Sequence, residues 1–228
     1  MKQAYFVTGT DTEVGKTTIA CALLKAARQM GLSTAAVKPV ASGCVNTAGG
    51  LRNEDALVLH QQCTQALSYQ QVNPFAFEPA IAPHLAARES AADLTVKALL
   101  APVQTVLAQG ANLTVVEGAG GWRVLLNERE TLADLAQALA LPVILVVGVR
   151  LGCINHALLS AEAIARDGLL LAGWVANVVD PQMSRLEENI ASLHERLNAP
   201  CLGEIPHLSQ VNADDVAGYL RLEALFKA

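Results

Sequence analysis

The chain has 228 residues, of which 52% are hydrophobic and 16% are charged, and its formal net charge is -5 at pH 7. This length and composition are typical of one large α/β domain with a substantial core, and the slight acidity argues against a broad nucleic-acid footprint. The five cysteines lie far apart without a Cys-x-x-Cys pair, which argues against a disulfide framework or a zinc site and favours a reducing cytoplasm.

The first expected element is an apolar strand over residues 4–7, which a glycine-bounded loop joins to an amphipathic helix over residues 19–30. The loop, residues 9–18, reads Gly-Thr-Asp-Thr-Glu-Val-Gly-Lys-Thr-Thr. Unpaired N–H groups and the dipole at a helix start favour an anion, Lys16 adds positive charge, and the Thr17 hydroxyl can hold Mg²⁺. This context predicts a nucleotide-phosphate site. The loop is one residue longer than the usual P-loop, and a plain strand–turn–helix corner is the alternative.

Strands and helices alternate along the rest of the chain. A strand over residues 34–37 ends at Lys38, a Gly/Ser/Asn-rich loop covers residues 41–52, and a helix starts near residues 53–55. Residues 68–89 contain three prolines and are expected to be irregular with short helical pieces. The later strands are expected at residues 112–116, 142–147, 169–176 and 201–205, and the later helices at residues 93–107 with Asp93 as cap, 131–140, 155–167, 184–198 and 214–226.

This alternation predicts a single domain over residues 1–228, built on a doubly wound, mostly parallel sheet with helices on both faces. The strongest apolar run, residues 141–149, has about half of the ~20 residues that a membrane-spanning helix needs. We therefore expect a cytoplasmic protein without a membrane partner.

Polar side chains follow the expected strands, at the sheet edge where ligands bind in folds of this kind. Glu117 directly follows a buried strand and can hold Mg²⁺, while the glycines of residues 118–121 let backbone approach a phosphate. Lys38 can stabilise charge on a transferred phosphoryl group, and Asp55 is the nearest downstream carboxylate that could join Glu117 at the metal. Ser42 can offer a hydroxyl to a polar substrate. The alternatives are an exposed glutamate, an exposed lysine and a helix-capping aspartate.

Residues 151–156, Leu-Gly-Cys-Ile-Asn-His, follow the most apolar strand and open a helix. A free helix start can bind a substrate carboxylate, and the alternative is an ordinary corner with Asn155 as cap. Cys153 is expected to be a small buried side chain, because it has no apparent base and acid partners. No metal-ligand spacing is found for the histidines, so structural or surface roles are expected for His60, His84, His156, His194 and His207.

Eight segments, in order over nearly the whole chain, resemble those of the dethiobiotin synthetase family. One is the loop at residues 9–17, whose additional residue is that family's own form. The others are Val-Lys-Pro-Val-Ala-Ser-Gly at 37–43, Leu-Arg-Asn-Glu-Asp-Ala-Leu at 51–57, Val-Glu-Gly-Ala-Gly-Gly-Trp at 116–122, Pro-Val-Ile-Leu-Val-Val-Gly at 142–148, Leu-Gly-Cys-Ile-Asn-His-Ala at 151–157, Gly-Trp-Val-Ala-Asn at 173–177 and Leu-Gly-Glu-Ile-Pro at 202–206. Together they are far more specific than a phosphate loop alone.

The resemblance implies a P-loop ligase that uses ATP and Mg²⁺ to convert 7,8-diaminononanoate and CO₂ into dethiobiotin in biotin biosynthesis. One amine takes up CO₂, ATP phosphorylates the resulting carbamate, and the second amine closes the cyclic urea with release of ADP and phosphate. Lys16 and Lys38 would then be catalytic. The metal would be held by Thr17, Asp55 and Glu117.

By the same resemblance, Ser42 would contact the substrate. The family is a homodimer, in which Gly152, Cys153 and Asn155 of one subunit would meet the tail carboxylate of a substrate bound in the other. The nucleotide site would be formed by Glu13, Val14, Gly15, Lys16, Thr17, Thr18, Asp55, Glu117, Gly118, Ala119, Gly120, Asn177, Pro206, His207 and Leu208.

Two other functions are compatible with these residues. One is a related P-loop ligase that acts on another substrate. The other is a switch ATPase that positions other molecules, as partitioning proteins do. Such switch ATPases carry an additional lysine early in the phosphate loop, where this chain has Thr10, Asp11 and Thr12.

Overall fold

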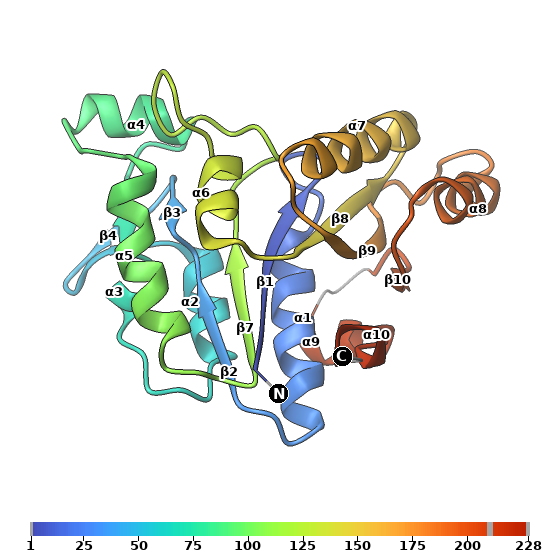
Figure 1. The fold of residues 1–228 in the computed structure, drawn as a ribbon, viewed down its shortest axis with the longest axis horizontal. Helices are drawn as coiled ribbons and strands as arrows, with labels where there is room; N and C mark the ends of the chain where they lie inside the picture. The colour runs from blue at the N-terminus through green and yellow to red at the C-terminus, as the bar shows by residue number, and fades with distance from the viewer. Residues whose placement is uncertain (1, 209–211, 227–228) are drawn as a thin grey trace.

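The computed structural model describes residues 2–208 and 212–226. A six-stranded sheet forms the centre, in the order β10-β9-β8-β1-β7-β2, and all of its neighbouring strands are parallel (Figure 1). The predicted doubly wound fold is confirmed. The strands are β1 (Gln3–Gly9), β2 (Thr34–Val37), β7 (Leu113–Glu117), β8 (Val143–Val149), β9 (Leu171–Val178) and β10 (Cys201–Ile205).

Helices cover both faces of this sheet (Figure 1). One face carries α1 (Lys16–Gln29), α2 (Glu54–Gln61), α9 (Ala213–Ala217) and α10 (Glu223–Phe226). The other face carries α5 (Val96–Leu107), α6 (Leu132–Leu139), α7 (Cys153–Arg166) and α8 (Leu186–Arg196). Among the described helices, none has both the length and the apolar character that crossing a membrane would require.

The most apolar run of the chain forms the strand β8. All its residues are buried, because helices cover the sheet on both sides. Side chains alternate between the faces of a strand. Accordingly, Ile144 and Val146 belong to the core cluster that includes α1, while Leu145 and Val147 belong to the cluster beneath α7 and α8.

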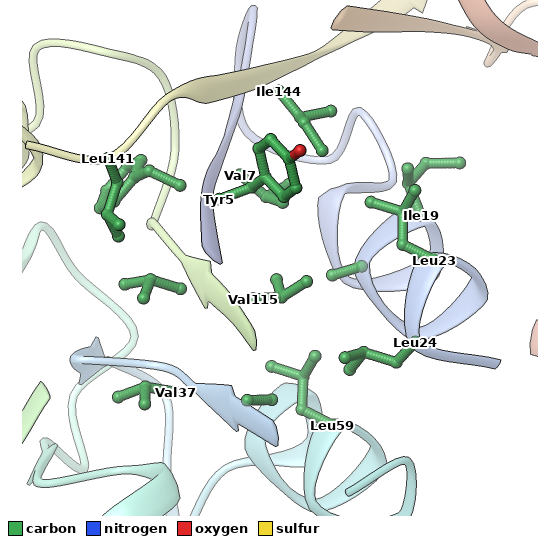
Figure 2. Packing of buried hydrophobic residues seen from close by; sticks show 14 of the residues in the cluster. Tyr5, Val7, Ile19, Leu23, Leu24, Val37, Leu59, Val115, Leu141 and Ile144 are labelled. Atoms are coloured by element: carbon green, nitrogen blue, oxygen red, sulfur yellow. The ribbon is translucent and has the colours of Figure 1, made fainter. Parts of the chain in front are cut away.

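The core beneath α1 holds the N-terminus of that helix at one end of β1. Figure 2 shows Ile19, Leu23 and Leu24 of α1 facing the sheet, where Tyr5 and Val115 lie. Ile19, Leu23 and Leu24 are fully buried. Truncating such a side chain to alanine typically costs about 2–5 kcal/mol, so α1 has one well-defined position against the sheet.

The stretch predicted to be a loop at residues 41–52 contains more structure than expected. β3 (Val40–Ala41) pairs in parallel with β6 (Phe75–Ala76), and β4 (Val45–Thr47) forms an antiparallel hairpin with β5 (Gly50–Arg52). The proline-containing region has the predicted short helices, α3 (Tyr69–Val72) and α4 (Pro83–Glu89).

Two predicted helix boundaries are wrong. Asp93 does not cap α5: the cap is Thr95, whose hydroxyl accepts a hydrogen bond from the Ala98 N–H at 3.2 Å. The helix expected over residues 214–226 is interrupted between α9 and α10. The chain turns back there, because the Arg221 N–H donates to the Leu202 carbonyl of β10 at 2.7 Å.

Candidate functional site

The phosphate loop lies between the carboxyl end of β1 and the start of α1, as predicted. Gly15 precedes the helix with a φ of 85°, in the left-handed region that favours glycine. A Cβ at this position would collide with the side chain of Asn177, which comes from the end of β9. The Asn177 amide also donates to the Val14 carbonyl at 2.9 Å. A residue from a distant strand therefore braces the loop.

Lys16 is buried at the base of the loop, with 7% of its surface exposed. Its ammonium group donates to the backbone carbonyl of Asp11 at 2.9 Å. Burial disfavours the charged form and lowers the pKa of Lys16 to about 8, against the opposing attraction of Glu117. A bound polyanion would supply the negative charge that this buried cation lacks.

A cluster of charged and hydroxyl groups, in which Lys38 and Glu117 are buried, lies next to the loop. The ammonium of Lys38 is 2.5 Å from Oε1 of Glu117 and 2.7 Å from Oδ2 of Asp55. The Thr17 hydroxyl donates to the same Glu117 oxygen at 2.8 Å. Glu117 is the last residue of β7 and is fully buried. The structure thus brings together four residues that lie as many as 100 positions apart in the sequence.

The charges in this cluster stabilise one another. Burial opposes the charged form of Lys38, but the two carboxylates outweigh burial and raise the pKa of this lysine. Burial also opposes the charged form of Asp55, but Lys38 outweighs it and lowers the pKa of this carboxyl group. At neutral pH, Lys38 and Asp55 therefore form an ion pair.

The same cluster has the chemistry of a magnesium site. Oε2 of Glu117 is buried and has no hydrogen-bond partner among the described residues. An orphaned carboxylate oxygen is costly unless a ligand satisfies it. Together with the oxygens of Thr17 and Asp55, it forms the hard oxygen set that Mg²⁺ prefers. These residues therefore fit the predicted metal.

Two cavities adjoin the phosphate loop. The larger one has a volume of about 770 Å³, which is in the range of small-molecule sites, and Ser42 lines it with a buried hydroxyl that has no partner among the described residues. The smaller one, of about 290 Å³, is lined by Asn177 and residues 206–208. Both cavities share Glu13, Gly15 and Thr18 as lining residues, so they form one continuous site.

Most of the predicted site residues lie in or beside these cavities. The larger cavity is lined by the predicted residues Glu13, Gly15, Lys16, Thr17, Thr18, Lys38, Ser42, Asp55, Ala119 and Gly120. Val14, Glu117 and Gly118 line neither cavity. Glu117 is fully buried in the charged cluster. Val14 and Gly118 are buried in packing contacts, Val14 against Gly148 and Gly118 against Phe6. Val14 and Gly118 therefore stabilise the loops through packing and do not face the cavities.

The turn at residues 151–155 is not part of the site within one chain. Gly152 and Asn155 are exposed, and neither cavity includes them. The predicted burial of Cys153 is confirmed, so this residue could offer a ligand only its backbone. Asn155 does not cap α7, because the cap position is held by Gly152 with a φ of 94°. If this turn meets a substrate, that substrate lies outside the site of its own chain.

Two further parts of the chain contribute to the site. Asn53 caps α2, and its amide donates to the Ser42 carbonyl at 3.3 Å, which joins the substrate side of the cavity to the helix that carries Asp55. Its position before two acidic residues is a helix-start signal that could have revealed it. Residues 80–83 form another wall of the larger cavity.

The parallel sheet, the phosphate loop and the adjoining carboxylate cluster define a P-loop nucleotide-binding protein. A family model described as "AAA domain" matches residues 3–215. The chain is 68% identical to "ATP-dependent dethiobiotin synthetase BioD" of Pseudomonas aeruginosa (strain UCBPP-PA14), over 97% of both chains. It is 58% identical to the protein of the same name from Cellvibrio japonicus, over 100% of this chain and 99% of that one. The chain belongs to the dethiobiotin synthetase family.

Solved structures support the fold alone. Signal recognition particle 54 kDa protein from Aeropyrum pernix has a TM-score of 0.53 and 17% identity, covering 99% of this chain and 45% of its own. The signal recognition particle receptor FtsY from Elizabethkingia anophelis has a TM-score of 0.52 and 14% identity, covering 100% of this chain and 66% of its own. The chain thus spans two thirds or less of these two structures.

Proposed function

We propose that the protein is an ATP-dependent dethiobiotin synthase, which makes the cyclic urea of dethiobiotin from 7,8-diaminononanoate and CO₂ in biotin biosynthesis. The observation that carries this proposal is the buried Lys38–Glu117 pair, 2.5 Å apart, beside the phosphate loop and the Ser42 cavity. A lysine at this position can stabilise negative charge on both a transferred phosphoryl group and an anionic acceptor.

The reaction proceeds in three steps. An amine nitrogen of the diamine attacks CO₂ and loses a proton, which gives a carbamate. A carbamate oxygen attacks the γ-phosphorus of ATP, the bond to the β-phosphate oxygen breaks, and ADP leaves. The second amine then attacks the carbonyl carbon of the mixed anhydride, loses a proton, and expels phosphate as the ring closes. Phosphorylation is needed because the carbamate is a weak electrophile with a poor leaving group.

The two lysines offset the negative charge that accumulates in the second step. Lys16, from the phosphate loop, would balance charge on the transferred phosphoryl group, and Lys38 would attract the carbamate oxygens. Thr17, Asp55 and Glu117 would hold Mg²⁺, which when bound would neutralise charge on the ATP phosphates. Because Lys38 is nearly inaccessible to water, its charge acts in a low-dielectric setting where it is most effective.

The two cavities suit the two substrates. The smaller one, bounded by Asn177 and residues 206–208, would take the adenine, and the larger one would take the phosphates and the diamine. Ser42 would then satisfy its orphaned hydroxyl on the substrate. This division assigns the predicted residues that line the cavities to adjoining parts of one site.

The protein would work as a homodimer. The turn that would receive the substrate's tail carboxylate carries Leu151, which is 88% exposed, and α7 presents Leu159, which is 57% exposed. A second copy would cover these leucines and bring the N–H groups at the start of α7 to the substrate of its neighbour.

A reconstituted assay tests the proposed function. Purified protein is supplied with the diamine, bicarbonate, ATP and Mg²⁺, and dethiobiotin and ADP are quantified by mass spectrometry. Equal amounts of dethiobiotin and ADP are expected, with neither formed when the diamine is omitted. Release of ADP only with a different acid would overturn the proposal and favour a related ligase. ATP-gated dimerisation without any product would favour a switch ATPase.

A further inference from the structure

A second cluster of metal-ligating side chains lies at the β10 edge of the sheet. It consists of His194 on α8 and of Cys201 and Glu204 on β10. Their ligand atoms all lie within 4.8 Å of one another. A cavity of about 400 Å³ opens onto all three side chains. It shares no lining residue with the two cavities around the phosphate loop, so this is a separate site.

A bulge in β10 creates this cluster. In a regular strand, residues three positions apart point to opposite faces. Here Cys201 pairs with Trp174, but Gly203 already pairs with Val175, so two steps along β10 match one step along β9. Glu204 consequently pairs with Ala176 and lies on the same face as Cys201. Bulges of this kind re-aim side chains and are frequent beside functional sites.

The surrounding structure orients His194 toward the two strand residues. Its ring packs edge-on against Trp174, with the ring centroids 5.0 Å apart. Trp174 is fully buried, and its indole N–H donates to the Ala199 carbonyl at 3.1 Å, so it forms a rigid support. Nε2 of His194 lies 2.8 Å from Oε1 of Glu204. The imidazole is thus held beside a carboxylate before any ligand arrives.

The thiol of Cys201 completes the set. Its Sγ donates to the Gly203 carbonyl at 3.4 Å, a weak bond that a metal–sulfur bond would replace. Arg221 also lines this cavity, and its backbone N–H donates to the Leu202 carbonyl at 2.7 Å. The Arg221 cation opposes a dication, but a thiolate and a carboxylate together supply two negative charges.

We propose that His194, Cys201 and Glu204 bind a transition-metal dication of the zinc class. One imidazole nitrogen, one thiolate and one carboxylate form a ligand set that suits Zn²⁺, Co²⁺ or Ni²⁺ and is too soft for Mg²⁺. Three protein ligands leave a fourth position for water. Binding would release the thiol proton and clamp α8 to β10. This metal-site proposal does not depend on the proposed synthase activity.

Cobalt spectroscopy tests the proposal on the full-length protein. Co²⁺ is titrated in the presence of excess Mg²⁺, and the near-ultraviolet charge-transfer band that only a thiolate ligand produces is recorded. The band is expected to saturate at one Co²⁺ per chain and to disappear when Zn²⁺ is added. Because the active-site cluster has only oxygen ligands, cobalt bound there cannot produce this band. Absence of the band in the wild-type protein would overturn the proposal.

Substitutions then assign the ligands. Cys201→Ser is expected to abolish the band, and His194→Ala to weaken cobalt binding at least tenfold. Cys63→Ser is the matched control, because Cys63 is also half-buried and donates its Sγ to a carbonyl, that of Leu59, at 3.4 Å. Loss of the band in Cys63→Ser, or its survival in Cys201→Ser, would contradict the assignment.

A measurement on unmodified protein avoids any dependence on folding of the variants. The rate at which iodoacetamide alkylates Cys201 is followed by peptide mapping, with and without Zn²⁺. Zinc is expected to slow this alkylation at least tenfold while leaving the rate at Cys63 unchanged. Equal rates at Cys201 under both conditions would refute zinc ligation by this thiol.

Discussion

The guanidinium group of Arg150 lies 2.5 Å from Oδ2 of Asp11, and this ion pair joins the end of β8 to the phosphate loop. The other oxygen of the Asp11 carboxylate accepts from the Thr12 N–H at 2.8 Å, and the Asp11 carbonyl accepts from Lys16 at 2.9 Å. Asp11 therefore connects a residue at the start of the exposed turn 151–155 with the lysine that would contact ATP. Surface ion pairs contribute only about 0–1 kcal/mol to the free energy of unfolding. We therefore expect the Asp11–Arg150 pair to act mainly on the position of the phosphate loop.

The Asp11–Arg150 pair can be tested by a double-mutant cycle. Asp11→Ala and Arg150→Ala are each expected to raise the KM for ATP by about two- to fivefold, the equivalent of about 0.5–1 kcal/mol. The double variant should be no worse than the poorer single variant, because both substitutions remove the same contact. Steady-state kinetics of all three variants gives the coupling energy.

Arg185 provides the control for this cycle. It pairs with Glu188 at 3.1 Å on the exposed surface of α8, far along the chain from the phosphate loop. Arg185→Ala should leave the KM for ATP unchanged. Strictly additive effects at Asp11 and Arg150 would argue against a shared positioning role.

Lys38→Ala should reduce turnover by about 10²–10³-fold while ATP still binds, because the lysine acts on charge that develops during transfer. The variant should also lose about 3–5 kcal/mol of unfolding free energy, since Glu117 would remain buried without its cation. Turnover is measured in the reconstituted assay, ATP binding by calorimetry and stability by urea unfolding.

Lys25→Ala is the matched substitution for Lys38. Lys25 forms an ion pair with Asp214, whose side chain is 67% exposed, and such a pair contributes little. This variant should retain both turnover and stability. If Lys38→Ala kept wild-type turnover, Lys38 would have only a structural role.

Gly15→Ala should abolish nucleotide binding. The left-handed backbone at Gly15 costs an alanine roughly 1–2 kcal/mol, and the added Cβ also collides with the Asn177 side chain. Gly31→Ala separates these effects, because Gly31 has a φ of 76° and no neighbouring atom within 4 Å of the added Cβ. Both variants should lose stability, but only Gly15→Ala should fail to bind a fluorescent ATP analogue. Nucleotide binding by Gly15→Ala would mean that the loop tolerates both the collision with Asn177 and the strained backbone.

Leu151→Arg should weaken self-association and raise the KM for the diamine without changing the KM for ATP. The substitution places a charge on a side chain that the proposed dimer covers, next to the turn that would receive the substrate tail. Leu170→Arg is the comparison, because Leu170 is 70% exposed but precedes β9 at the opposite end of the strands. Sedimentation velocity distinguishes the two. A wild-type protein that is monomeric at assay concentration would exclude the shared site.

Much of the site was predictable because each part carries a local signal. The phosphate loop has its glycines and Lys16 between a strand and a helix, and Glu117 ends an apolar strand. Parallel strands bring their carboxyl ends to one edge, so these residues had to approach one another. The break after α9 carries no such signal, since the Arg221 N–H finds its partner in β10. The hairpin at residues 45–52 is a local pairing, but its two strands are only three residues long, too short for a recognisable periodicity.

The cluster of His194, Cys201 and Glu204 could not be predicted from the sequence either. The spacing of these residues does not resemble a metal motif, and regular strand geometry would separate Cys201 from Glu204. Only the register shift between β9 and β10 places the two on one face, beneath the helix that carries His194. A bulge is decided by how two strands pair, which a single strand's sequence does not reveal.

The sequence by itself determined the chain order of the six central strands and of the main helices around them, the family, and the residues that would meet phosphate, metal and substrate. Hydrophobic periodicity and loop chemistry depend on residues close together in the chain, so they can be recognised in the sequence. Tertiary structure decided that Lys38 bridges Glu117 and Asp55, that Arg150 holds the phosphate loop, and that residues 151–155 lie outside their own chain's site. Those outcomes depend on strand register and on contacts between distant residues, which only the folded chain defines.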